Sequence, residues 1–245
     1  MNILITRPLE DARPLRALLL DKGHHPIIEP LLEIVPRNPD VAPIDLSGVQ
    51  ALLFTSANGV RIFAQRIPDR SLPVFTVGSA TAAAAQSAGF ATVSSAGGDV
   101  SDLAALVRER LAPDQGCLFQ PVASVRAGDL QADLQHSGFT LRRAIIYDAL
   151  PAIRFSEGTR RALEANEIDG VLLFSPRTAE TFSTLVRRDG LCVCLKRCLA
   201  LCLSPAVEAK IGDLPWRDIR VAAMPDQKSL LACLDRTGQA VNEAE

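Results

Sequence analysis

The sequence predicts an α/β protein made of two similar domains, each with a parallel sheet covered by helices on both faces. Short apolar segments alternate with helical patterns of about 10–15 residues, which is typical of βαβ units. Several apolar segments end on Ser or Thr where a helix should begin, as in ALLFTSANG (51–59) and VLLFSPRT (171–178). A length of 245 residues fits two domains of roughly 100–150 residues better than one very wide sheet.

The first half of the chain begins with an apolar segment and a helical pattern. NILIT (2–6) predicts the first strand, and the next segment predicts a helix that ends at Gly23 in a left-handed cap. The leucines that fit one face of this helix are Leu15, Leu18, Leu19 and Leu20. The strands expected next are 51–54, 73–78, 117–122 and 141–150, and the helices are 60–67, 79–89, 99–111 and 125–138. Asp99 or Ser101 is the candidate N-cap of the helix at 99–111.

The second half repeats this alternation. Helices are expected at 156–167, 176–190, 205–214 and 228–236, and strands at 169–175, 198–204 and 218–224. Residues 51–63 resemble residues 171–182, and residues 73–84 run parallel to residues 199–210. This internal similarity favours two similar small domains over a single large one.

Two strand-like segments bounded by proline interrupt the alternation. They are HPIIEPLLEIVPR (25–37) and RRAIIYDALPAI (142–153). As ordinary linkers, they would separate consecutive domains. As a paired two-stranded connector, they would leave 37–147 inserted into a domain made from both chain ends. Periodicity alone does not choose between these arrangements.

The composition excludes several classes of function. Hydrophobic residues make up 48% of the chain but aromatic residues only 4%, so we expect a core of Leu, Val, Ile and Ala. A net charge of −2 with mixed signs argues against a nucleic-acid-binding surface, which needs a concentrated basic patch. No apolar run reaches about 18 residues, and the N-terminus lacks the pattern of a signal peptide. We therefore expect a cytoplasmic protein with neither a nucleic-acid partner nor a membrane partner.

The six cysteines are interpreted as small apolar residues of strands. Four of them lie in LCVCLKRCLALC (191–202), which lacks the paired CxxC spacing and contains no His, Asp or Glu. Disulfides are not expected in a reducing compartment. The sequence therefore predicts no metal cluster in this segment.

The hydroxyl residues at the predicted strand ends suggest an anion site. In a parallel sheet the carboxyl end of each strand faces the start of a helix, where free N–H donors gather. These junctions carry Thr6, Thr55 with Ser56, Ser79 with Thr81, Ser175, and Ser204. Helix capping explains any single junction, but five in one chain favour binding of carboxylate or phosphate at this edge.

Common catalytic motifs are absent from the sequence. It contains no GxGxxG, GxxxxGK[ST], GxSxG or HExxH pattern. The pattern indicates anion binding by backbone donors and hydroxyl groups, with little conventional acid–base equipment.

An ordered set of short motifs resembles the uroporphyrinogen-III synthase family over nearly the whole chain. The motifs are ITRP (5–8), FTSANGV (54–60), VGSATA (77–82), IIYDA (145–149), FSPRTAETF (174–182) and LSPAVEA (203–209). The resemblance implies two α/β domains, 1–35 with 151–245 and 37–147, joined by a two-stranded β connector. It also implies an active site in the cleft between the domains.

The resemblance further implies a reaction. Hydroxymethylbilane, a linear tetrapyrrole with eight carboxylates, is closed to uroporphyrinogen III with loss of water and inversion of the last pyrrole ring. No metal or organic cofactor is required, and the expected partner is this small-molecule substrate, bound by a monomer. Tyr147 is implied to assist departure of the hydroxyl group. The residues implied to bind substrate are Arg7, Ser56, Ser79, Thr81, Arg126, Ser175, Arg177 and Ser204.

Two further hypotheses compete with this one. A non-catalytic two-domain module could bind a polyanionic small molecule with the same hydroxyl turns. A sugar-phosphate transferase with two α/β domains is disfavoured, because the sequence lacks the acidic metal-binding motif of such enzymes.

Overall fold

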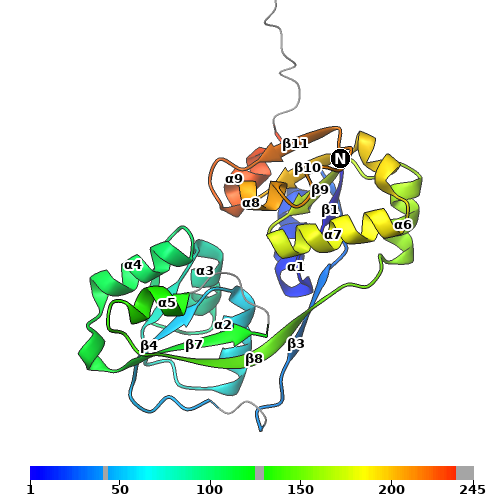
Figure 1. Ribbon diagram of the computed structural model, residues 1–245. Coiled ribbons are helices and arrows are strands. Elements are labelled where there is room, and N and C mark those ends of the chain that lie inside the picture. Colours follow the sequence, from blue (N-terminus) through cyan, green and yellow to red (C-terminus); the bar gives the residue numbers. More distant parts are fainter. Residues whose placement is uncertain (41–43, 125–129, 236–245) are drawn as a thin grey trace, which may run out of the picture. The chain divides into compact units, whose positions relative to one another are not determined.

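The computed structural model describes residues 1–40, 44–124 and 130–235 (Figure 1). The chain forms two compact units. Unit 1 contains Met1–Glu33 and the chain from Leu150 onward, and unit 2 contains Ile34–Ala149. Each unit is built on its own sheet with parallel strand pairs, so the predicted α/β fold class is confirmed.

Unit 1 contains a five-stranded sheet in the order β11-β10-β9-β1-β2, and its neighbouring strands run parallel. The strands are β1 (Asn2–Ile5), β2 (His25–Ile28), β9 (Gly170–Leu173), β10 (Leu199–Cys202) and β11 (Asp218–Val221). The helices are α1 (Leu9–Asp21), α6 (Glu157–Glu164), α7 (Pro176–Arg188), α8 (Pro205–Glu208) and α9 (Gln227–Ala232), with a 3-10 helix at Cys192–Arg197. Because side chains alternate along β1, Leu4 packs with α7 on one face, whereas Ile3 and Ile5 pack with α1 and α9 on the other.

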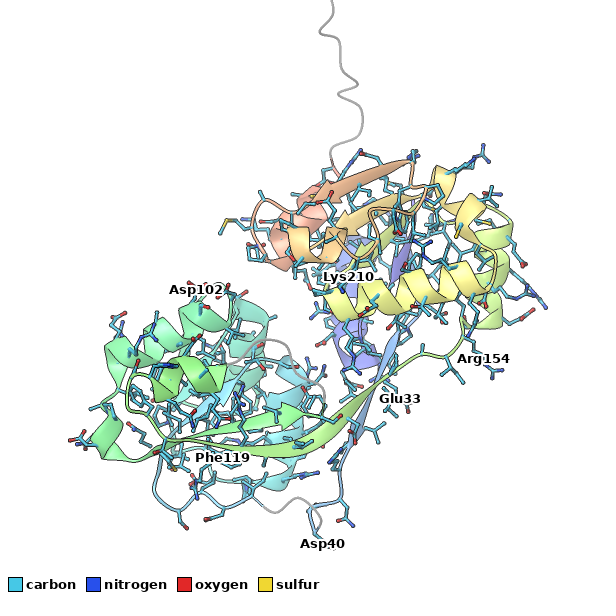
Figure 2. All side chains as sticks on the ribbon, in the orientation of Figure 1. Glu33, Asp40, Asp102, Phe119, Arg154 and Lys210 are labelled. Atoms are coloured by element: carbon cyan, nitrogen blue, oxygen red, sulfur yellow. The ribbon has the colours of Figure 1, made fainter. Side chains whose placement is uncertain are left out.

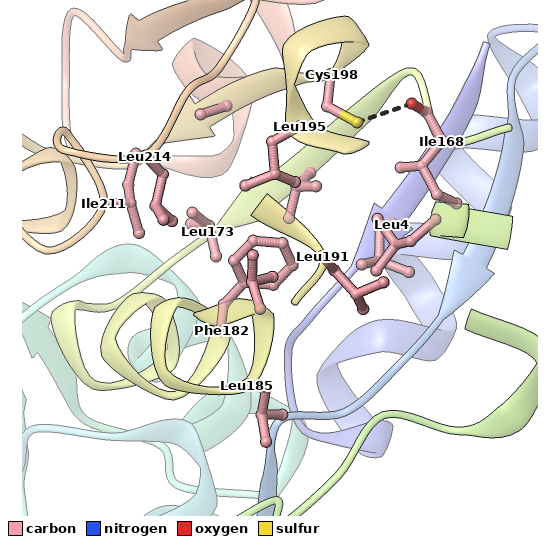
Figure 3. Close-up of a cluster of buried hydrophobic side chains, with 14 of the residues drawn as sticks. Leu4, Ile168, Leu173, Phe182, Leu185, Leu191, Leu195, Cys198, Ile211 and Leu214 are labelled. Carbon is pink, nitrogen blue, oxygen red and sulfur yellow. Dashed lines mark hydrogen bonds between the residues drawn. The ribbon is translucent and has the colours of Figure 1, made fainter. Parts of the chain in front are cut away.

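Phe182 on α7 lies at the centre of the core on one face of this sheet (Figure 3). Its side chain is fully buried. The ring centroid lies 5.7 Å from that of Phe155 in edge-to-face geometry and 5.5 Å from that of Trp216 in a stacked geometry. The indole Nε1 of Trp216 donates to the carbonyl oxygen of Ile211 at 3.0 Å, so its polar group is satisfied. These aromatic contacts join α7 to the segments before α6 and β11.

Unit 2 contains a six-stranded sheet in the order β3-β8-β7-β4-β5-β6. The strands are β3 (Leu32–Pro36), β4 (Val49–Phe54), β5 (Val74–Thr76), β6 (Val93–Ser95), β7 (Cys117–Ala123) and β8 (Leu141–Pro151). The helices are α2 (Ala57–Arg66), α3 (Ser79–Ser87), α4 (Val100–Arg110) and α5 (Leu130–Gln135), with a 3-10 helix at Pro113–Gln115. Phe54 packs with α2 and α3 on one face of the sheet, and Leu53 packs with α4 and α5 on the other.

The two sheets share one strand order. Unit 1 reads β2-β1-β9-β10-β11, and unit 2 reads β8-β7-β4-β5-β6 before its extra strand β3 is counted. The similar sequences at 51–63 and 171–182 therefore occupy equivalent places, as β4 with α2 and as β9 with α7. The chain enters this common arrangement at a different strand in each unit.

The strands β3 and β8 lie side by side (Figure 1). The N–H of Arg37 donates to the carbonyl oxygen of Ile146 at 2.9 Å, and the N–H of Ala152 donates to that of Leu31 at 3.0 Å. Residue numbers rise on one strand as they fall on the other, so the pair is antiparallel. Glu33, labelled in Figure 2, marks the division between units within β3.

The strand-like segment at 25–37 forms two strands, β2 and β3, which join different sheets. Glu29 lies at the break, and its carboxylate is buried. This carboxylate accepts from the N–H of Ser156 at 2.9 Å and from the hydroxyls of Ser156 and Thr159 at 2.5 Å each. The start of α6 thereby satisfies a buried charge, which fixes the chain between the two strands.

Arg37 and Asp148 form a two-bonded ion pair across the β3–β8 pair, with both N–O distances at 2.9 Å. The Arg37 guanidinium lowers the pKa of Asp148 to about 2, with a smaller contribution from a hydrogen bond with Ser124. Because the folded-state pKa lies below the ordinary value of 3.8, the pair stabilises the fold above that value. This contribution is lost as pH falls from about 4 to about 2.

We therefore expect Asp148→Asn to lower the urea midpoint of unfolding at pH 6 and to leave a smaller difference from wild type at pH 2.5. Urea titrations at the two pH values measure this. Asp114→Asn, which removes a carboxylate from the 3-10 helix before β7, is the control and should show no such pH-dependent difference. Equal midpoints for Asp148→Asn and wild type at pH 6 would contradict the expectation.

Two elements differ from the sequence expectation. Of the four leucines expected on one face of α1, Leu15 and Leu19 are buried, whereas Leu18 and Leu20 are 45% and 43% exposed. The buried pair is four residues apart and therefore shares one face, from which the other two leucines are rotated away. The strand β6 is not predicted by the sequence, because three residues are too few to show a period.

The predicted cap of α4 is confirmed: Asp99 caps it, and Asp102, labelled in Figure 2, completes a capping box.

The cysteines are free thiols, but they are not all strand residues. Cys192 and Cys194 lie in the 3-10 helix before β10, because a short apolar run does not distinguish strand from helix. Desolvation raises the pKa of Cys198 and of Cys202 to about 12, so both thiols stay protonated near neutral pH. Cys198 Sγ donates to the carbonyl oxygen of Ile168 at 3.0 Å (Figure 3). These two cysteines act as small core residues.

Among the described residues, no helix is both long enough and apolar enough to cross a membrane.

Candidate active site

Each sheet has a place where neighbouring strands lead to helices on opposite faces. In unit 1, α1 follows β1 and α7 follows the adjacent strand β9, and these helices cover opposite faces. In unit 2, α2 and α5 follow the adjacent strands β4 and β7 and again cover opposite faces. Ligands of open α/β sheets bind outside the carboxyl ends of the strands at such points. The residues that follow β1, β9, β4 and β7 are therefore the first candidates.

Ser175 follows β9 and caps α7. Its Oγ accepts from the N–H of Thr178 at 3.1 Å and lies 2.8 Å from Thr178 Oγ1. Pro176 occupies the first turn, where its missing N–H costs nothing. Ser175 and Arg177 are half-buried, so both lie at the rim of the structure and not in the core. The helix start offers a hydroxyl and backbone donors to an anion.

Ser56 takes the same role after β4. It caps α2, and its Oγ accepts from the N–H of Asn58 at 3.2 Å. The Asn58 side chain in turn accepts from Arg61 Nη1 at 2.9 Å. The prediction that this hydroxyl turn starts a helix is confirmed. Ser56 has the extended backbone of Ser175, but its hydroxyl accepts from the N–H two residues on instead of three.

After β5 the helix α3 begins at Ser79, as the sequence predicts. Gly78 is the N-cap of α3, and no side chain caps this helix. Ser79 is an exposed residue at the first helical position, whereas Thr81 is buried, at 7% exposed. Glycine has no side chain that could accept a hydrogen bond from the first N–H groups of the helix. Those N–H groups without a backbone acceptor therefore donate to solvent or to a ligand. The two hydroxyls therefore have different surroundings.

The remaining hydroxyl turns are weaker candidates. Ser204 stands at the start of α8, but it makes no capping hydrogen bond and the helix has only four residues. Thr6 is fully buried, and its hydroxyl donates to the carbonyl oxygen of Leu172 at 2.6 Å. This bond ties the end of β1 to β9, so the Thr6 hydroxyl serves the fold.

Arg7 follows β1 and contacts residues from three other segments. Its Nη1 donates to Gln227 Oε1 at 3.1 Å, and its Nη2 lies 3.6 Å from Asp11 Oδ2. The guanidinium carbon lies 4.4 Å from the centroid of the Phe174 ring, which follows β9. The side chains of Arg7 and Asp11 are only 15% and 9% exposed. The cation thus lies over Phe174, the residue before Ser175, just after the strand that neighbours its own.

Tyr147 lies in β8 beside the end of β7. The pairing of Val122 with Ile145 shifts to that of Ala123 with Tyr147, so β8 carries an extra residue here. Ile146 and Tyr147 are consequently both buried in one core cluster, and Ile145 is exposed. Such bulges redirect side chains next to functional sites.

The Tyr147 ring packs against the start of α2. A methyl group built on Gly59 would lie at an ordinary contact distance of 3.7 Å from Tyr147 Cε1, so the ring lies directly beside this turn of the helix. The Tyr147 side chain is 5% exposed, and the N–H of Ser124 donates to its carbonyl oxygen at 3.1 Å. The phenol is therefore held in a water-poor position near the end of β7.

The structure thus places the candidate residues in two groups. Arg7, Ser175 and Arg177 follow neighbouring strands of unit 1, with Ser204 one strand further along. Ser56, Thr81 and Ser79 follow neighbouring strands of unit 2, which also contains Tyr147. Arg126 lies outside the described residues.

Sequence reasoning missed three residues around Arg7, namely Asp11, Phe174 and Gln227. Phe174 could have been found from the sequence, because it is the last apolar residue before Ser175. Gln227 gave no signal beyond its place after Asp226, the N-cap of α9, because its partner lies 220 residues away. Within the part of the chain that the structure describes, no group of three metal-ligating side chains occurs.

Comparisons with known proteins agree with this arrangement. A family model described as uroporphyrinogen-III synthase HemD matches residues 13–232. A mutant uroporphyrinogen III synthase from the extremely thermophilic bacterium Thermus thermophilus is similar, with 18% identity, a TM-score of 0.59, and coverage of 96% of this chain and 98% of that one. The uroporphyrinogen-III synthetase of Helicobacter pylori is also similar, with 16% identity and a TM-score of 0.63. The match covers 95% of this chain and 97% of that one. At these identities the solved structures establish the fold alone. No curated protein matches the chain.

Proposed function

The chain belongs to the uroporphyrinogen-III synthase family, and from this membership we propose that the carboxyl edges of its two sheets bind the substrate. The enzyme closes hydroxymethylbilane to uroporphyrinogen III with loss of water and inversion of the terminal pyrrole ring, in heme biosynthesis.

The observation that carries the proposal is the pair of capped helix starts at the switch points. Ser175 starts α7 after β9, and Ser56 starts α2 after β4. Backbone N–H groups and hydroxyls at a helix start bind carboxylates without bringing a counter-charge of their own. Arg7 and Arg177 add positive charge at the edge of unit 1. Several donors spread over two edges suit a long substrate with many carboxylates.

Ser79 and Thr81 are also proposed to bind substrate, because they lie at the uncapped start of α3. Because Gly78 offers no side-chain acceptor, a substrate carboxylate could take the place of the missing cap. Ser204 is included with a smaller role, as α8 is a single turn. Arg126 keeps the role that the family resemblance implies.

Tyr147 is proposed to assist the loss of water. The bond between the terminal carbon and its hydroxyl breaks as the adjacent pyrrole supplies electrons, and the Tyr147 phenol donates its proton to the departing oxygen, so that water leaves. The proton lost from the pyrrole carbon on ring closure then restores the phenol. A buried position keeps bulk water from adding to the cation that remains. The other residues hold the linear tetrapyrrole so that closure with inversion is faster than the spontaneous closure without it. Each tenfold preference between the two closures requires a difference of about 1.4 kcal/mol in activation free energy.

The test supplies freshly prepared hydroxymethylbilane to the purified protein, oxidises the products and separates the porphyrin isomers. We expect isomer III to predominate, whereas heat-denatured protein gives isomer I. Isomer I alone, formed at the uncatalysed rate, would overturn the enzyme assignment and leave a polyanion-binding module.

We also propose that the enzyme works as a cytoplasmic monomer on this small-molecule substrate. Free thiols at all its cysteines suit a reducing compartment. Sedimentation equilibrium should give the mass of one chain, and a concentration-independent mass of two chains would contradict the monomer.

A further inference from the structure

We infer that Gln227 is a positioning residue for Arg7, which it orients through a neutral amide so that the positive charge stays available to a substrate carboxylate. This inference rests on the proposed binding of substrate at the carboxyl edge of unit 1. Neither Gln227 nor its role follows from the sequence motifs.

The geometry around Arg7 favours one orientation of its guanidinium. Phe174 supports one face of the group at 4.4 Å, and Gln227 Oε1 accepts from Nη1 at 3.1 Å. Asp226 fixes the start of α9, since its Oδ1 accepts from the N–H of Ser229 at 2.7 Å. Gln227 therefore stands on a capped helix start. A long cationic side chain that is already ordered loses less conformational entropy when it binds a ligand.

The chemistry of Asp11 and Gln227, two of the groups that contact Arg7, explains why an amide suits position 227. Asp11 supplies one negative charge, but its Oδ2 lies 3.6 Å from Nη2, which is longer than a good hydrogen bond. Gln227 makes the shorter contact and carries no charge. A second carboxylate at position 227 would leave the group of three side chains with net negative charge. With Arg7 only 15% exposed, solvent would screen that charge poorly, and an anionic substrate would be repelled.

The test is Gln227→Glu, which keeps the shape and the acceptor but adds the charge. We expect KM for hydroxymethylbilane to rise about tenfold, with kcat within about twofold of wild type. The unfolding temperature should stay the same or rise, because Arg7 gains an ion pair. Gln65→Glu adds the same charge to an exposed site on α2 and should leave KM and kcat at wild-type values.

A raised KM without a loss of stability separates positioning from a structural role. A KM equal to that of wild type in Gln227→Glu would overturn the inference. A raised KM together with a lower unfolding temperature would also overturn it, since the loss would then reflect local damage. Arg7→Lys, which cannot keep the planar stack on Phe174, should raise KM about tenfold or more. A wild-type KM in Arg7→Lys would equally overturn it.

The same assay distinguishes failure of this inference from failure of the proposed function. If wild type yields only isomer I, the enzyme assignment fails and the inference falls with it. If wild type makes isomer III and Gln227→Glu does so with unchanged KM, the inference alone is wrong.

Discussion

The Tyr147→Phe variant is expected to lose about 100-fold in kcat while its KM stays within about twofold of wild type. Phenylalanine keeps the ring that packs near Phe54 and Gly59, so the substrate-binding edges are preserved. Only the group proposed to stabilise the departing hydroxyl is removed. Loss of the hydroxyl should cost about 1 kcal/mol of unfolding free energy, which leaves the protein folded.

Single-turnover kinetics with separation of isomers I and III measures this effect. Phe119→Leu changes a second buried aromatic residue in the same core cluster and controls for altered packing near Tyr147. It should keep kcat within about threefold of wild type. A Tyr147→Phe variant with full kcat would remove the phenol from the mechanism without affecting the family assignment.

The Phe182→Ala variant is expected to lose about 3–5 kcal/mol of unfolding free energy, the largest effect on stability that we predict. Phe182 is fully buried, and its ring is held between Phe155 and Trp216. Truncation leaves a cavity whose walls belong to three segments of unit 1, and such a cavity collapses only partly.

Urea unfolding followed by tryptophan fluorescence measures this loss. Trp216 is the only tryptophan of the chain and stacks on Phe182, so its emission reports on unit 1. Phe182→Leu keeps most of the volume and should lose less than about 2 kcal/mol. A loss below about 1 kcal/mol in Phe182→Ala would show that the core on this face repacks freely.

Local chemistry explains why much of the fold could be read from the sequence. A helix start depends on residues within one turn, so Ser175 is identified as a cap, and Asp99 as a candidate cap, from their neighbours alone. The alternation of apolar strands with helices likewise predicts parallel sheets. The sequence also predicts that a helix begins at Ser79, but it does not show that this helix start has no side-chain cap.

Parts of the candidate site could be found only in the tertiary structure, because there a residue contacts partners that are far away in the sequence. The bulge in β8 that buries Tyr147 depends on pairing with β7, and strict alternation would have placed Ile145 and Tyr147 on the same face.

The sequence by itself determined the fold class, the place where several helices begin and, through its motifs, the family. Only the tertiary structure decided that 25–37 divides between two sheets, that the Thr6 hydroxyl is used by the fold, and that Gln227 holds Arg7. The physical reason is one of range. Caps and periodic patterns are satisfied within a few residues, whereas strand order and buried polar contacts depend on partners that only folding brings together.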